Sequence, residues 1–382
     1  MFSNKQIERI KKKQTPFFVY DLNLLQNTLT ALKQHAGNDV KIHYALKANS
    51  NLKLLDCIKK SGLGADCVSG NEVKQSIKCG FLPNDIVFAG VGKSDHEINY
   101  ALEQNICCFN VESISELFVI NQLAAKQHKK AAIALRVNPN IDAYTHKYIT
   151  TGLQENKFGI NPYEFEEVIQ ILKTLSHVEL IGLHFHIGSQ ITSLVPFEKL
   201  CTRVNEINQW FIEHGIYVES INLGGGLGIN YHEPDSEVIV DFKSYFDVFR
   251  NFLKLQPNQK IHFELGRSIV GQCGTLMARV LHVKKGINTN FAILDAGMTE
   301  LIRPALYEAY HKIENITSEN STLLKYDIVG PICESSDCFG KAVLLPETKR
   351  GDIIAIRSAG AYGEAMSLNY NLRKPAGKLY LK

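Results

Sequence analysis

The sequence has 382 residues, 45% of them hydrophobic and 21% charged, which are the proportions of an ordinary soluble globular protein. The length allows two domains, and the net charge of +3 is too small to favour a nucleic acid or an anionic membrane as partner. No apolar stretch is long enough to span a bilayer, and the first residues lack the apolar core expected of a signal peptide. The nine cysteines lack CxxC spacing, which favours reduced thiols in the cytoplasm over disulfides or zinc.

The first residues are expected to be a solvated start, because residues 9–13 are mostly basic. Eight short apolar runs then recur, separated by segments of helical periodicity. Runs that are apolar throughout are typical of strands buried on both faces of a parallel sheet. Eight such units in about 240 residues predict one (β/α)8 barrel, with a doubly wound open sheet as the competing fold. The expected strands are residues 40–46, 63–68, 85–89, 106–111, 131–137, 178–185, 218–223 and 261–265. The expected helices are residues 51–61, 70–79, 95–104, 113–129, 162–175, 196–214 and 241–255.

After residue 265 the pattern changes to strand-like runs separated by short turns. These runs are residues 275–284, 291–295, 325–329, 341–345 and 353–358, with one helical stretch near 300–310. The pattern predicts a second, all-β domain, a β-sandwich or β-barrel, and the early strand 17–20 is expected to join it. The expected domains are therefore a barrel over residues 27–270 and a β domain made of residues 1–26 and 271–382.

Active-site residues of such barrels lie at the carboxyl ends of the strands, and the first strand ends in Lys47. A lysine that is desolvated there loses part of its ammonium character, so Lys47 is a candidate to form a Schiff base. The alternative is a lysine whose side chain extends from a strand end to water.

The later strand ends carry other polar groups. Glycines at 224–226 follow the seventh run, where backbone N–H groups can converge on a phosphate. Glu264 and Arg267 follow the eighth run, and the alternative for them is an ordinary ion pair on the rim. His184 and His186 end the sixth run without a third ligand, so a metal site is set aside. Arg136, near the end of the fifth run, adds a further cation to the same end of the barrel. One cofactor uses an amine, a phosphate cradle and an acid together: pyridoxal 5'-phosphate.

These stretches resemble the diaminopimelate decarboxylase family of pyridoxal-phosphate enzymes, which has the alanine-racemase fold. The resemblance runs from about residue 15 to residue 362. The motifs that carry it are HYALKAN at 43–49, HIGSQ at 186–190, GGGLG at 224–228, ELGR at 264–267 and GPICESSD at 330–337. One departure is Leu265, where the family usually has proline, and a backbone adjustment is expected there.

The resemblance implies a role for each matching residue. Lys47 would carry the cofactor, His186 would stack on its pyridine ring, and Glu264 would bind the ring nitrogen. Cys333 would be the proton donor, supplied with Glu334 by the partner subunit of a head-to-tail homodimer. The groups expected around the phosphate or its edge are Ser189, Gly225, Gly226, Gly266, Arg267 and Tyr362. The groups expected to hold the far end of the substrate are Arg267, Arg303, Tyr307, Glu334 and Tyr362.

The reaction that this implies is decarboxylation of meso-2,6-diaminopimelate to L-lysine, the last step of lysine biosynthesis. Glu264 favours it over racemisation, because a carboxylate keeps the ring nitrogen protonated whereas the racemases of this fold place an arginine there. The rivals are a decarboxylase of ornithine, arginine or carboxynorspermidine, a non-catalytic carrier of the cofactor, and a cofactor-free Schiff-base aldolase. Whether residues 145–154 close over the site as a lid stays open.

Overall fold

The computed structural model describes residues 2–141 and 157–381 and divides the chain into two compact units. The barrel unit comprises Leu29–Gly228 and Asp241–Gly266, and the β unit comprises Met1–Thr28, Ile229–Val240 and Arg267–Lys382. The segment Ile229–Val240 lies inside the expected barrel range yet packs with the β unit. Its Asp235 is one reason, because Oδ1 accepts from the Arg357 guanidinium at 2.9 Å. The possible lid at 145–154 lies outside the described residues.

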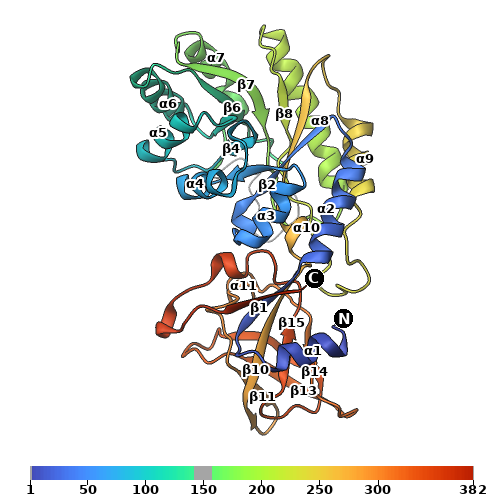
Figure 1. The fold of residues 1–382 in the computed structure, drawn as a ribbon. Helices are drawn as coiled ribbons and strands as arrows, with labels where there is room; N and C mark the ends of the chain where they lie inside the picture. The colour runs from blue at the N-terminus through green and yellow to red at the C-terminus, as the bar shows by residue number, and fades with distance from the viewer. Residues whose placement is uncertain (1, 142–156, 382) are drawn as a thin grey trace. The chain divides into compact units, whose positions relative to one another are not determined.

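The barrel unit is built on a closed ring of eight strands in which every neighbouring pair is parallel, so the open-sheet alternative is excluded (Figure 1). Each strand falls on one of the eight apolar runs. The strands are β2 (Val40–Ala45), β3 (Gly64–Cys67), β4 (Ile86–Phe88), β5 (Cys108–Val111), β6 (Ala131–Arg136), β7 (Val178–His184), β8 (Ser220–Asn222) and β9 (Lys260–Leu265).

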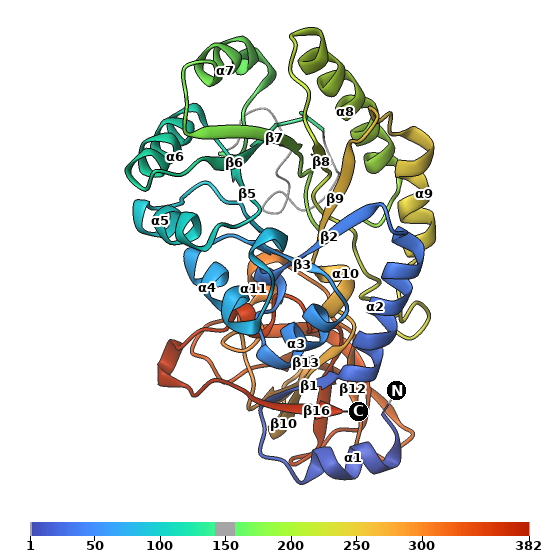
Figure 2. The same ribbon diagram turned by 45° about the horizontal axis from the view of Figure 1, so that its top comes forward.

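Helices lie outside this ring of strands (Figure 2). Several begin at a serine whose hydroxyl accepts a backbone N–H of the first turn: Ser69, Ser94 and Ser113 cap the helices that follow them. The helices are α2 (Leu22–Ala36), α3 (Leu52–Lys60), α4 (Gly70–Cys79), α5 (Asp95–Gln104), α6 (Ile114–Lys126), α7 (Phe165–Leu172), α8 (Val195–Glu213) and α9 (Phe242–Phe252). Among the described residues, no helix is long and apolar enough to cross a membrane.

The β unit contains one mostly antiparallel sheet with the strand order β12-β15-β10-β11-β13-β14, in which β1 also pairs with β10 and β16 pairs with β1. The early strand therefore joins this unit, as expected. The strands are β1 (Phe17–Asp21), β10 (Gly274–Lys285), β11 (Asn290–Leu294), β12 (Ile313–Asn315), β13 (Leu323–Val329), β14 (Cys338–Pro346), β15 (Ile353–Ile356) and β16 (Gly377–Leu381). The helices are α1 (Asn4–Lys11), α10 (Arg267–Val270) and α11 (Arg303–Tyr307).

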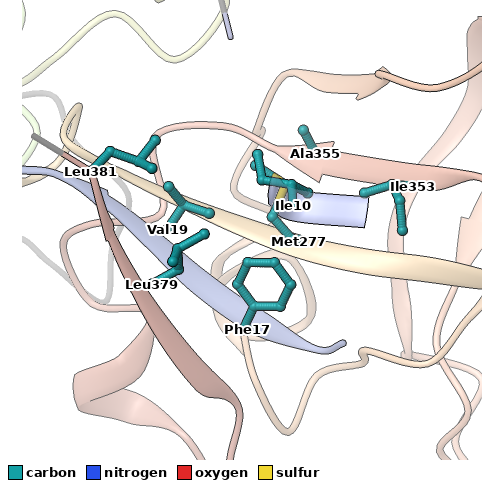
Figure 3. Close-up of a cluster of buried hydrophobic side chains, with 8 residues drawn as sticks. All are labelled: Ile10, Phe17, Val19, Met277, Ile353, Ala355, Leu379 and Leu381. Atoms are coloured by element: carbon teal, nitrogen blue, oxygen red, sulfur yellow. The ribbon is translucent and has the colours of Figure 1, made fainter. Parts of the chain in front are cut away.

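The first residues are not merely a solvated start, because they form helix α1 with Ile10 fully buried. Ile10 packs in an apolar cluster with Phe17 and Val19 of β1 and Met277 of β10 (Figure 3). Leu379 of the last strand belongs to the same cluster. Segments from both ends of the chain thus share one core, which holds β1 in the β unit. Helix α2 follows directly after β1 in the chain.

Candidate active site

Lys47 lies in a short 3-10 turn, η1 (Leu46–Ala48), directly after β2. Its Nζ is 3.3 Å from Oδ2 of Asp66 in β3, and the Asp66 side chain is fully buried. The setting expected for Lys47 was apolar, and the structure instead places it against a carboxylate with 36% of its side chain exposed. Burial, together with the charge of Glu264, raises the pKa of Asp66 to about 6. Lys47 therefore has a neighbour that can take up or release a proton near neutral pH.

Glu264 ends strand β9 and is held by three side chains of the barrel interior. Its Oε1 accepts from Nδ2 of Asn110 at 3.0 Å and from Nδ2 of Asn222 at 2.8 Å. His184 Nε2 lies 2.8 Å from Oε2. Burial alone would raise the pKa of Glu264, but the hydrogen bond and charge of His184 and the charge of Lys47 hold it well below its usual range. The result is a fixed negative charge at the end of the eighth barrel strand.

The glycine turn after β8 lies against the backbone of β9. The Gly224 carbonyl accepts from the Glu264 amide at 2.7 Å, and Gly224 has a φ of 66°. A Cβ at Gly225 would lie 2.0 Å from the Glu264 carbonyl oxygen, so only glycine fits there. Gly266 permits a second close approach, because a Cβ there would lie 2.9 Å from that of Ala48. Gly225 thus brings the backbone close to Glu264, and Gly266 brings it close to the turn that carries Lys47.

The two histidines of the sixth predicted strand have different partners. His184 contacts Glu264, whereas His186 Nδ1 accepts from the Gly225 amide at 3.3 Å. Burial, followed by the charges of Lys47 and Arg136, lowers the pKa of His186 well below its ordinary value, so its ring is neutral. Ser189 follows in the same loop. Within the described ranges, no three or more His, Cys, Asp or Glu side chains are arranged to hold a metal ion.

Arg136 does not offer an unpaired cation. Its Nη1 is 2.6 Å from Oε1 of Glu112, and both side chains are buried. The other oxygen of Glu112 accepts from the Gly159 amide at 3.0 Å, and the Arg136 guanidinium lies 4.6 Å from the centre of the Phe158 ring. Arg136 is therefore a paired cation that links Glu112 to the chain after β6, and its charge still acts on His186.

A second group of predicted residues comes together within the β unit. Arg267, at the start of α10, donates from Nη1 to the Tyr231 hydroxyl at 2.6 Å, and its guanidinium lies 4.7 Å from the centre of the Tyr362 ring. Arg303 begins α11 and lies 4.6 Å from the Tyr231 ring, while Tyr307 ends the same short helix. The partners of Glu264 are Asn110, Asn222 and His184, whereas those of Arg267 in this cluster are Tyr231 and Tyr362.

Cys333 lies in an exposed loop that Asp337 organises. The two carboxylate oxygens of Asp337 accept from the amides of Met298 at 2.6 Å and Ile332 at 2.7 Å. Cys333 is a free, exposed thiol, and Oε1 of Glu334 accepts from the Tyr370 hydroxyl at 2.8 Å. Asp337 therefore holds the backbone of the loop in place, while the Cys333 thiol remains exposed at the surface.

The barrel residues fit pyridoxal phosphate. An amine, a glycine turn packed too closely against backbone to accept a Cβ, a neutral imidazole and an ionised carboxylate all lie in the barrel unit. Two buried atoms there, Oδ1 of Asp66 and Nδ1 of His184, have no hydrogen-bond partner among the described residues. Buried polar atoms are normally paired, which points to a polar ligand or water in the site.

Sequence reasoning missed Asp66, Asn110 and Asn222, although each left a signal. Each is a polar residue at or near the carboxyl end of a short barrel strand, in the segments β3, β5 and β8. A barrel strand buried on both faces has no reason to carry such a residue unless a partner lies opposite. Two of these partners are now visible: Lys47 faces Asp66, and Glu264 receives both amides.

Known proteins resemble this chain over almost its whole length. Residues 22–271 match the family model described as pyridoxal-dependent decarboxylase, pyridoxal binding domain. A diaminopimelate decarboxylase of Bacteroides thetaiotaomicron is 56% identical over 370 residues, covering 96% of each chain. One of Helicobacter pylori is 42% identical and covers 100% of this chain and 93% of its own. The crystal structure of diaminopimelate decarboxylase from Helicobacter pylori, complexed with L-lysine, superposes with a TM-score of 0.93 at 42% identity, covering 99% of this chain and 94% of that one.

Proposed function

Because the chain belongs to the diaminopimelate decarboxylase family of pyridoxal-dependent decarboxylases, we propose that it converts meso-2,6-diaminopimelate to L-lysine and carbon dioxide, the last step of lysine biosynthesis. It is a carbon–carbon lyase, and its cofactor is pyridoxal 5'-phosphate. The single observation that supports the reaction type best is the state of Glu264. A buried carboxylate that receives two amides and an imidazole stays ionised at the end of the eighth strand.

When bound, pyridoxal phosphate accepts the electron pair that is left on the α-carbon as carbon dioxide departs. Glu264 would hold a proton on the ring nitrogen, because a nearby negative charge favours the protonated form. Lys47 would hold the cofactor through its Nζ, and Asp66 beside it could accept or return the proton of that amine. His186, whose ring is neutral, would hold the cofactor ring, and Ser189, Gly225, Gly226 and Gly266 would hold the phosphate.

The far end of the substrate carries an ammonium group and a carboxylate beyond the reacting carbon. Arg303 suits the carboxylate, because its planar fork can donate two parallel hydrogen bonds. Arg267, Tyr307 and Tyr362 complete this recognition, and Glu334 pairs with the ammonium group. Substrates without the distal carboxylate, such as ornithine, would leave the buried Arg303 unpaired and be rejected roughly 10⁴-fold.

Cys333 delivers the proton to the α-carbon after carbon dioxide has left, a role that an exposed, positioned thiol can perform. It acts with Glu334 in the site of the partner subunit of a cytoplasmic homodimer. Mixing the inactive variants Lys47→Ala and Cys333→Ala tests this arrangement, because a mixed dimer contains one site with both residues intact. Recovery of part of the activity is expected, and no recovery in a mixture with proven subunit exchange would contradict sharing.

Two measurements test the reaction itself. Release of carbon dioxide is compared for diaminopimelate, lysine, ornithine, arginine and carboxynorspermidine, and clear preference for diaminopimelate is expected. Mass spectrometry after borohydride reduction locates the cofactor, which should be found on Lys47 and be lost in Lys47→Ala. Preference for a substrate without the distal carboxylate would contradict the assignment of Arg303, and bound cofactor without any turnover would favour a non-catalytic carrier.

A further inference from the structure

Arg303 is a buried cation whose partners are all neutral. The residue is 5% exposed, its Nη1 lies 2.7 Å from Nε2 of His311, and its guanidinium carbon lies 4.6 Å from the centre of the Tyr231 ring. No carboxylate pairs with it within residues 2–141 and 157–381. A buried charge is normally paired, because removing it from water is costly. The positive charge of Arg303 is thus held in place but not neutralised.

His311 can hold Arg303 only as a neutral acceptor. It is 1% exposed, and its Nδ1 lies 2.8 Å from the carbonyl oxygen of Arg357, which can only accept. The proton of the ring is therefore on Nδ1, and Nε2 presents a lone pair to the guanidinium. Burial and the charge of Arg303 lower the pKa of His311 to about 3, so the ring stays neutral at neutral pH. A backbone carbonyl thus selects the tautomer that Arg303 requires.

Tyr231 supports the same guanidinium from its aromatic face. Its ring lies beneath Arg303 and edge-on to His311, with 5.0 Å between the two ring centres. Its hydroxyl accepts from Arg267, so one side chain contacts both buried arginines. A cation over an aromatic face is attracted without losing its charge. Tyr231 comes from Ile229–Val240, the segment that packs with the β unit.

We infer that His311 and Tyr231 are positioning residues that aim Arg303 at the distal carboxylate of the substrate while leaving its charge intact. An acidic residue in the place of His311 would hold Arg303 as firmly, but it would neutralise the charge that the substrate needs. A neutral acceptor uses one donor of the fork and leaves the others for a bidentate pair. This inference rests on the proposed function, and it adds two residues that determine substrate choice without touching the reacting atoms.

Three substitutions of His311 separate geometry from charge. His311→Gln can accept from Arg303 and donate to the Arg357 carbonyl, so it keeps both contacts. His311→Leu removes the acceptor, and His311→Glu keeps an acceptor but adds a negative charge. Tyr231→Leu removes the aromatic face that contacts Arg303, together with the hydroxyl that accepts from Arg267. His282→Glu is the matched control, because it adds the same charge at an exposed histidine of β10 outside the cluster.

The readout is equilibrium binding of L-lysine and cadaverine to each holoenzyme by calorimetry. The two ligands share their diamine skeleton, and only lysine carries the carboxylate that Arg303 would bind. We expect His311→Glu to weaken lysine binding roughly 10- to 100-fold, the loss of a charge-assisted interaction, and to leave cadaverine binding within about twofold. His311→Leu and Tyr231→Leu should weaken lysine binding less and raise KM for diaminopimelate more than they lower kcat. His311→Gln and His282→Glu should bind both ligands as the wild type does.

Two results would overturn the inference. One is lysine binding to His311→Glu that is as tight as in the wild type. The other is an equal loss for lysine and cadaverine in the variants, which would indicate general damage to the site. If His311→Glu does not fold, the comparison of His311→Gln with Tyr231→Leu decides the question in the same way. Turnover of diaminopimelate by the wild type is measured first, so a failure of the proposed function would be recognised separately.

Discussion

Asp66 offers a test of the electrostatics of the barrel interior. Its carboxylate is fully buried 3.3 Å from Nζ of Lys47, and Asp66→Asn keeps the shape of the side chain while removing its charge. Burial, with the charge of Glu264, raises the pKa of Asp66 from its ordinary 3.8 to about 6. The folded protein therefore binds this proton more tightly than the unfolded chain does. The stability that Asp66 contributes is complete below pH 3.8 and is lost as the pH rises through 6.

The size of this loss follows from the two pKa values. Across the whole titration the difference corresponds to about 3 kcal/mol, and the part between pH 5 and pH 8 is about 1.4 kcal/mol. Asparagine does not titrate. The free energy of unfolding of the wild type should therefore fall by about 1.4 kcal/mol relative to that of Asp66→Asn between these two pH values.

Urea unfolding of both proteins, stripped of cofactor and followed by circular dichroism, measures this difference at each pH. Asp56→Asn is the control, because Asp56 is an exposed acid paired with Lys60 and its pKa is lowered by that hydrogen bond. The control should show no such loss as the pH rises. The reasoning is refuted if the gap between the wild type and Asp66→Asn is the same at pH 5 and pH 8. It is also refuted if the free energy of unfolding of the wild type rises relative to that of Asp66→Asn as the pH rises. A rise of that kind is expected only of a carboxylate whose pKa is lowered on folding.

Three further predictions concern the rest of the site. Asn222→Leu removes one amide from Glu264, and the loss of a hydrogen bond to a charged group, about 1.5–3 kcal/mol, should lower kcat/KM for diaminopimelate roughly 10- to 150-fold. Steady-state kinetics check this, and an unchanged kcat/KM would show that the amide does not matter. Gly225→Ala sets a Cβ against the Glu264 carbonyl oxygen, so absorbance spectra should show loss of bound cofactor and thermal melts a lower Tm; full occupancy would contradict the cradle. Cys333→Ser should change stability by less than about 0.5 kcal/mol, because the residue is exposed, but should lower kcat roughly 10²- to 10⁴-fold if the thiol is the proton donor.

Much of the fold follows from the sequence because its signals are local. An apolar run of five to eight residues followed by a helical segment repeats until the ring is complete, and each run overlaps a barrel strand. The elements that were not predicted have weak local signals. Strand β12 has only three residues, and helix α1 buries little beyond Ile10. The family motifs likewise lie in short contiguous stretches, so Lys47, His186 and Glu264 could be chosen before any geometry was known.

The partners of these residues were decided only by the tertiary structure. Closure of the barrel pairs β2 with β9, which are more than 200 residues apart, and the register of the strands then determines what each polar side chain faces. Lys47 thereby faces Asp66, His184 contacts Glu264, and Arg136 pairs with Glu112. Local periodicity tells which face of a strand is buried, but not which side chain lies across a closed ring. The electrostatic state of a buried group depends on that neighbour, so it is fixed only once the chain has folded.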